Sequence, residues 1–225
     1  AILRSAHELK AGLQAFQAEQ AGRLRIAASF TIAEYLLPQW LGRFARAHPG
    51  DSVALEVANS TSVIERLRDG GADLGFIETT SSLPDLEEQL VGTDELIAVV
   101  GPTHPWAKRR TVPVEALAAT PLVTREAGSG TREALEDALA ALDLGPPTAV
   151  LELGSTSAVR SAVLDANSPT VISRLAVAAE LETGSLVEIE VKDLAITRSL
   201  RAVWPHRQPL PPLAAQLLDS LGLSA

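Results

Sequence analysis

The apolar positions of the chain follow two different periods, and each period predicts a different kind of element. In the first segment Ile2, Leu9 and Phe16 repeat every seven residues, which predicts a helix that ends at Gly22 and carries one apolar stripe. Such a stripe either pairs with a second helix or packs on its own domain, and the pattern fits both. From Arg23 onward short apolar runs alternate with helical stretches, which is typical of βαβ units with mainly parallel strands.

This alternation forms two series, separated by a break at residues 101–105, where one glycine and two prolines interrupt the pattern. The expected strands cover residues 24–28, 52–58, 73–77, 96–100, 122–125, 148–153, 170–173, 186–191 and 200–204. The expected helices cover residues 32–47, 62–69, 131–142, 155–166, 175–182 and 212–221. Two such series predict an α/β protein with two lobes.

Composition narrows the class of protein further. The 225 residues are 46% hydrophobic and 21% charged, which is typical of a globular chain that can bury a real core. The absence of cysteine excludes disulfides, thiolate metal sites and a cysteine nucleophile. A net charge of −9 and an aromatic content of 4% argue against nucleic-acid binding by this chain.

The apolar runs and the first residues bear on where the protein works. No apolar run approaches the ~20 residues that a membrane span needs, so we expect no membrane association. The first residues lack the pattern of an export signal, so we expect a cytoplasmic protein. The first residue is not methionine, and we expect the sequence to be a piece of a longer protein.

The strongest local feature is the loop at residues 126–132, which follows an expected strand and opens an expected helix. Ser129, Gly130 and Thr131 offer backbone N–H groups and hydroxyls at the positive end of a helix, which is the form of an anion-binding loop. The loop is neither a phosphate-binding Walker sequence nor a Gly-x-Ser-x-Gly elbow. A flexible loop that ends in a helix cap is the alternative reading.

Other hydroxyl clusters follow other strands, at residues 29–31, 59–61 and 154–157. Ligands of open α/β sheets bind beyond the carboxyl ends of the strands, so we expect these clusters to face a common region. Ser29 and Thr31 belong to the first cluster, and Glu78 follows the apolar strand 73–77. Each cluster taken alone is also typical of a helix cap. Glu78 taken alone is also typical of an exposed carboxylate at a strand end.

No catalytic or metal-binding set emerges from the sequence. The four histidines lie in the first helix or in turns, without metal-ligand spacing to a second ligand. Adjacent carboxylates such as Asp94 and Glu95 are expected to be exposed. We therefore predict no enzymatic activity, no cofactor and no metal.

The order of these motifs resembles the effector-binding domain of LysR-type transcriptional regulators. The matching stretches are GRLRIAASFTIAEYLLP at residues 22–38, GADLGFIE at 71–78, DEL at 94–96 followed by His104-Pro105, REAGSGTR at 125–132 and ISRLAV at 172–177. The resemblance covers essentially the whole chain. Residues 165–169 depart from it, because DANSP stands where many members carry Ala-Gly-x-Gly.

The resemblance implies two Rossmann-like lobes joined by two crossover strands, a fold similar to type 2 periplasmic binding proteins, preceded by a helix. Residues 1–22 would form the end of a linker and dimerisation helix. Residues 23–95 and 199–225 would form regulatory lobe I, and residues 96–198 would form regulatory lobe II. An N-terminal winged helix-turn-helix domain, which binds DNA in the family, would be missing here.

The resemblance also implies a small-molecule effector in the cleft and a homo-oligomer, either a dimer or a tetramer. DNA would be bound only through the missing N-terminal domain. The effector-binding residues carried over from the family are Ser29, Phe30, Thr31, Glu78, Ser129, Gly130, Thr131 and Ser173. We expect the effector to be a small anion or a metabolite with a carboxylate, because hydroxyl-rich turns converge on the cleft.

Two other classes of protein share the two-lobe design. A periplasmic-type solute-binding protein would need an export signal, and the heptad helix counts against it. A transferase similar to hydroxymethylbilane synthase would need a cofactor-bearing cysteine, which this chain lacks.

Overall fold

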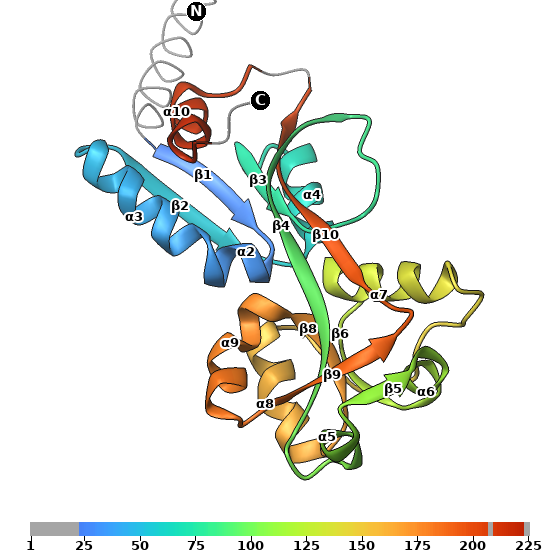
Figure 1. Ribbon diagram of the computed structural model, residues 1–225. Helices are drawn as coiled ribbons and strands as arrows, with labels where there is room; N and C mark the ends of the chain where they lie inside the picture. Colours follow the sequence, from blue (N-terminus) through green and yellow to red (C-terminus); the bar gives the residue numbers. More distant parts are fainter. Residues whose placement is uncertain (1–22, 207–208, 223–225) are drawn as a thin grey trace, which may run out of the picture.

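The computed structural model describes residues 23–206 and 209–222. Two α/β lobes are joined by two long strands, β4 (Leu86–Val100) and β10 (Ile196–Pro205), which run antiparallel to each other through both lobes (Figure 1). The predicted fold class is thereby confirmed. The predicted lobe boundaries, at 95/96 and 198/199, fall inside these two strands. The helix predicted for residues 1–22 lies outside the described residues.

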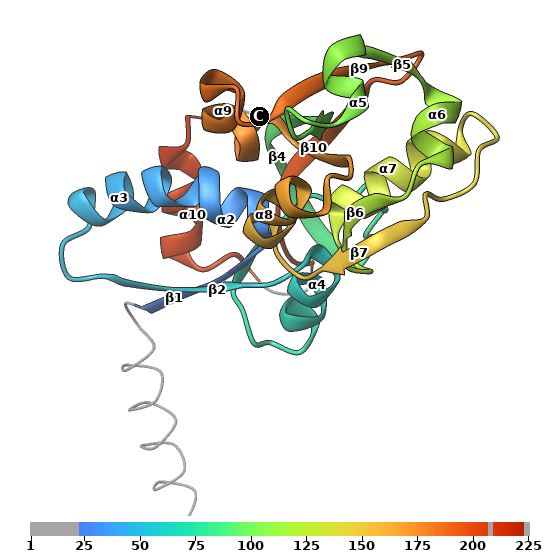
Figure 2. The same cartoon turned by 90° about the horizontal axis from the view of Figure 1, so that it is seen from below.

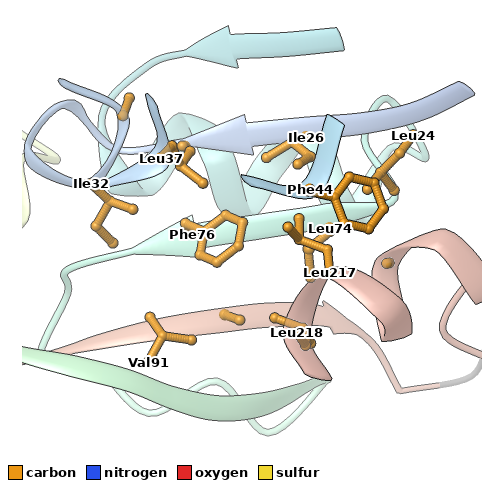
Figure 3. Close-up of a cluster of buried hydrophobic side chains, with 14 of the residues drawn as sticks. Leu24, Ile26, Ile32, Leu37, Phe44, Leu74, Phe76, Val91, Leu217 and Leu218 are labelled. Atoms are coloured by element: carbon orange, nitrogen blue, oxygen red, sulfur yellow. The ribbon is translucent and has the colours of Figure 1, made fainter. Parts of the chain in front are cut away.

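The first lobe is built on three parallel strands that join the crossing strands in the order β2-β1-β3-β10-β4. The strands are β1 (Arg23–Ala28), β2 (Ser52–Val57) and β3 (Leu74–Ile77), and the helices are α2 (Phe30–Tyr35), α3 (Leu37–Ala47), α4 (Ser60–Arg68) and α10 (Pro212–Ser220). Leu24, Phe44, Leu74, Phe76 and Leu217 meet on one face of this sheet, between β3 and the two helices α3 and α10 (Figure 3). Their burial packs α3 and α10 against this sheet.

The second lobe surrounds the other half of the crossing strands. Its strands are β5 (Thr111–Pro113), β6 (Leu122–Arg125), β7 (Ala149–Leu153), β8 (Thr170–Ser173) and β9 (Val187–Lys192). Its helices are α5 (Pro105–Arg109), α6 (Val114–Ala119), α7 (Gly130–Ala140), α8 (Thr156–Ala166) and α9 (Arg174–Thr183). β8 and β9 both pair with β4, whereas β6 and β7 form a separate parallel pair at one side of the lobe (Figure 2). Apolar clusters on both faces of β4 hold this lobe together.

Three expectations about the elements are wrong. The single helix expected over 32–47 is two helices separated at Leu36, because Pro38 has no N–H to donate to the carbonyl of Glu34. The strand expected over 96–100 begins at Leu86, and α5, β5 and α6 were not expected at all. The main sheet is mixed rather than mainly parallel, because each crossing strand runs antiparallel to its neighbours.

Candidate functional site

Arg198, on β10, contacts both lobes with a side chain that is 0% exposed. Its Nε and Nη2 donate to Asp94 Oδ2 at 2.9 and 2.6 Å, and its Nη1 forms an ion pair of 2.7 Å with Glu78 Oε2. Its Nη1 and Nη2 also donate to the hydroxyls of Thr131 and Thr31, at 3.0 and 3.1 Å. We call these five residues the Arg198 cluster.

The cluster joins every part of the fold. Thr31 lies in α2 and Glu78 directly follows β3, so both come from the first lobe. Thr131 lies in α7 of the second lobe. Arg198 and Asp94 face each other across the two crossing strands, where they are paired residues in the register of β10 and β4. One guanidinium therefore contacts both lobes and the strands that connect them.

Glu78 enters the space between the lobes rather than facing solvent, and it is 2% exposed. Its Oε1 accepts from the hydroxyl of Ser29 at 2.8 Å and from the backbone N–H of Ile32 at 3.1 Å. Its backbone N–H donates to the Ser60 hydroxyl at 3.3 Å. The carboxylate is thus held by two hydrogen bonds at Oε1 and by the ion pair with Arg198 at Oε2.

Ser173 reaches the cluster through Asp94. Its hydroxyl donates to Asp94 Oδ1 at 2.7 Å and accepts from the backbone N–H of Leu175 at the start of α9. The expectation that Asp94 is exposed is wrong, because pairing with Arg198 across the strands holds it at 4% exposure. Glu95, the next residue, points the other way and has a side chain that is 55% exposed.

The loop before α7 packs directly on the first lobe. A Cβ atom on Gly130 would lie 2.6 Å from the carbonyl oxygen of Glu78, so only glycine allows this approach. The backbone N–H of Thr61 donates to the Gly128 carbonyl at 3.2 Å. Ser129 is buried at the N-cap position of α7, but its side chain makes no capping hydrogen bond. The loop is a contact between the lobes rather than a free turn.

Phe30 makes a further contact between the lobes. Its ring lies 4.6 Å from the guanidinium carbon of Arg125, at the end of β6. Arg125 also forms an ion pair with Glu126 at 2.8 Å and donates to the Thr156 hydroxyl at 3.1 Å. Burial acts to raise the pKa of Glu126, but the hydrogen bonds and charge of Arg125 outweigh it, so the pKa lies below its ordinary value.

The predicted residues therefore converge, but not in one open pocket. Ser29, Thr31, Glu78, Thr131 and Ser173 are joined through Arg198 and Asp94, and all of them are at most 4% exposed. A hollow beside Arg125 and Thr131 has a volume of about 20 Å³, enough for about one water molecule. The cluster itself carries two negative charges and one positive charge.

Sequence reasoning missed Arg198 and assigned Asp94 to the surface. The signal for Arg198 was present, because Ile196, Arg198 and Leu200 alternate with the exposed Thr197 and Ser199 along β10. An arginine in the buried phase of a strand needs buried partners, and the buried carboxylates supply them. Among residues 23–206 and 209–222, no group of three His, Asp or Glu side chains is placed to hold a metal ion. In the same part of the chain, no helix has the length and apolar character to cross a membrane.

The chain is similar to known regulators over nearly its whole length. Residues 17–223 match the family model described as LysR substrate binding domain. An uncharacterized HTH-type transcriptional regulator of Mycobacterium tuberculosis is 42% identical over 212 residues, which are 90% of this chain and 68% of that protein. The HTH-type transcriptional regulator YeiE of Escherichia coli K12 is 35% identical over 210 residues, which are 92% of this chain and 69% of that protein.

Solved structures give the same picture. The regulatory domain of Synechocystis CcmR, in complex with 2-PG, superposes with a TM-score of 0.80 at 28% identity, covering 89% of this chain and 95% of that one. The effector-binding domain of QuiR, in complex with shikimate, superposes with a TM-score of 0.78 at 16% identity and the same coverage, a likeness of fold alone.

Proposed function

This chain belongs to the family of LysR substrate-binding domains, and from that premise we propose that the space around the Arg198 cluster is its effector site. In this proposal a small molecule binds between the lobes, and the change is transmitted to an N-terminal winged helix-turn-helix domain that binds DNA. Coupling of this kind needs two sites that favour the same arrangement of the protein.

The observation that carries the proposal is the contact of one guanidinium with both lobes. Arg198 binds Thr31 and Glu78 of the first lobe and Thr131 of the second, and it is anchored on Asp94. A ligand that exchanges any of these contacts changes what holds the lobes together. Packed interfaces of this kind respond by shifting between discrete arrangements.

The donors around the cluster favour a small oxyanion. Thr31 and Thr131 accept hydrogen bonds from Arg198, so each hydroxyl keeps its own hydrogen for a ligand. Ser129 adds a hydroxyl that does not cap its helix. The complex of CcmR with 2-PG supports a ligand in this fold. We therefore propose a metabolite that carries a carboxylate or a similar anionic group.

The roles of the predicted residues follow from their contacts. Ser29, Thr31, Ser129 and Thr131 would donate to the ligand, while Phe30 and Gly130 would shape the space. Glu78 would line the ligand's site, and Ser173 would act through Asp94.

The wider organisation is proposed on the family's pattern. Residues 1–22 would end a linker helix, residues 23–95 and 199–225 would form lobe I, and residues 96–198 would form lobe II. A homo-oligomer, either a dimer or a tetramer, is supported by exposed apolar side chains on β2 and β7, which are Leu55, Val57, Val150 and Leu151. The protein would act in the cytoplasm, without catalysis, and would reach DNA only through its N-terminal domain.

Binding of small carboxylates and oxyanions tests the effector site. We expect a panel of such metabolites, screened by thermal shift and followed by calorimetry, to include a ligand of the wild-type chain. Thr131→Val should weaken that ligand by about tenfold or more, since hydrogen bonds to charged groups are worth ~1.5–3 kcal/mol. Thr183→Val removes an exposed hydroxyl that binds only its own helix and the neighbouring Ser185, and it should leave the affinity unchanged. Full affinity in Thr131→Val would remove this loop from the site.

A further inference from the structure

Glu78 is bound as a ligand would be bound. Its two carboxylate oxygens contact three donor groups: they accept hydrogen bonds from the Ser29 hydroxyl at 2.8 Å and the Ile32 N–H at 3.1 Å, and they form an ion pair with Arg198 Nη1 at 2.7 Å. We call these three donors the carboxylate site. All three belong to parts of the chain at least 46 residues away from Glu78 in sequence.

The carboxylate site is held in place by contacts that do not involve Glu78. The Ser29 N–H donates to the Phe76 carbonyl at 2.9 Å, which fixes the turn after β1. Two nitrogens of Arg198 donate to Asp94 Oδ2, and Asp94 is fixed in turn by Ser173. Without the Glu78 side chain the three donors would remain buried and aimed at one point. Buried donors without an acceptor are costly, so this point requires an anion.

The backbone of Glu78 is held in place by contacts that do not involve its side chain. Its carbonyl oxygen lies against Gly130, and its N–H donates to Ser60. Rotation of the side chain would therefore free the donors without moving the strand end. Glu78 and Asp94 already give the cluster an excess of one negative charge, which an added anion would increase. The charges therefore favour an anion that replaces the Glu78 carboxylate over one that binds beside it.

We propose that Glu78 is an internal anion that occupies the effector's carboxylate site, and that an effector binds by placing its own carboxylate on Ser29, Ile32 and Arg198 in exchange. The inference rests on the effector site proposed above. It makes Glu78 the residue that sets both affinity and ligand class. An effector must carry a carboxylate-sized monoanionic group, and its affinity is the net result of competition with Glu78.

Chemical rescue tests this without knowledge of the natural effector. Glu78→Ala removes one methylene and the carboxylate, and acetate restores the same atoms. We expect sodium acetate to raise the melting temperature of Glu78→Ala saturably, with formate less effective and sodium chloride of equal ionic strength ineffective. Glu78→Gln keeps the side chain but loses the charge, and it should respond to acetate more weakly. The wild type should need about tenfold more acetate than Glu78→Ala for half the effect, because it retains a charged competitor.

Glu88→Ala is the matched control, since it also removes a glutamate from an arginine, at 2.6 Å from Arg201, but on the surface. It should show no saturable response to acetate. Equal responses in the wild type and both Glu78 variants, or a response in none of them, would overturn the proposal. If Glu78→Ala does not fold, the acetate response of the melting temperature of Glu78→Gln, compared with that of the wild type, decides the question. If the acetate test fails but Thr131→Val still weakens the binding of a metabolite, the effector site stands and only the exchange with Glu78 is refuted. The two proposals can therefore be refuted separately.

Discussion

Replacing Arg198 by methionine removes the charge at the centre of the molecule but keeps an apolar stem. The side chains of Glu78 and Asp94, its two ion-pair partners, are 3% and 1% exposed, so both carboxylates would stay buried without this cation. Removal of one partner from a buried ion pair costs about 3–5 kcal/mol. A chain of this size loses roughly 2–4 °C in melting temperature per kcal/mol, so we expect Arg198→Met to melt roughly 6–20 °C below the wild type.

Urea unfolding of three variants separates charge from packing. Arg66→Met removes an arginine whose ion pair with Glu56 is half-exposed, and it should cost less than about 1 kcal/mol. A triple variant that adds Glu78→Gln and Asp94→Asn to Arg198→Met buries no charge, and it should regain part of the lost stability. The reasoning is refuted if Arg198→Met costs no more than Arg66→Met, or if the triple variant is less stable than Arg198→Met.

Three further predictions concern packing, pH and assembly. Gly130→Ala should destabilise by about 1–3 kcal/mol although alanine favours helices, because its Cβ would meet the Glu78 carbonyl. The identical change at Gly42, within α3 and with no atom inside 4 Å, should stabilise by about 0.5–1 kcal/mol. Burial lowers the pKa of His104, so this histidine binds a proton more readily in the unfolded chain than in the folded one. The free energy of unfolding should therefore decrease as the pH falls below 6.5. In analytical ultracentrifugation the chain should sediment as a dimer, and a chain that starts at Arg23 should remain dimeric if the lobes provide most of the interface.

Each of these has a clear contrary result. Equal effects of alanine at the two glycines would show that the lobes do not approach as closely as the structure has them. The imidazole of His104 accepts from the Trp106 N–H, and His104→Asn keeps a capping acceptor that does not titrate. The urea midpoint of this variant should therefore change less than that of the wild type between pH 7.5 and pH 5.5. Parallel pH profiles would exclude His104 as the cause. A monomer in both lengths of chain, well above micromolar concentration, would contradict the assembly prediction.

Local periodicity was enough to predict most of the elements. The strands β1, β6 and β8 lie within one residue of their expected bounds, because each is a short apolar run that ends at polar turn residues. Prediction failed along a strand that belongs to both lobes. β4 begins ten residues before the expected position, and the first ten residues escaped prediction because only Leu86, Val91 and Asp94 are buried among them, without a regular alternation.

The hydroxyls of the candidate site and Glu78 were predicted from the sequence, whereas Arg198 and Asp94 were missed. Ser29 and Thr131 follow strand ends, so a rule about sheet edges brings them together from sequence alone. Arg198 and Asp94 lie in the middle of strands, and only the register of β10 with β4 makes them neighbours. Register depends on long-range pairing, which no local pattern of residue types contains.

The closed arrangement of the cluster has a consequence for how an effector would act. Every contact that a ligand would take from Glu78 is already satisfied within the protein, so binding releases only the difference between new and old contacts. That difference is what can be converted into movement of the lobes, because a ligand shifts an equilibrium only by its differential affinity for the two states. A charged internal competitor at the centre therefore limits affinity, but it also ensures that no ligand can bind there without changing the contacts that join the lobes.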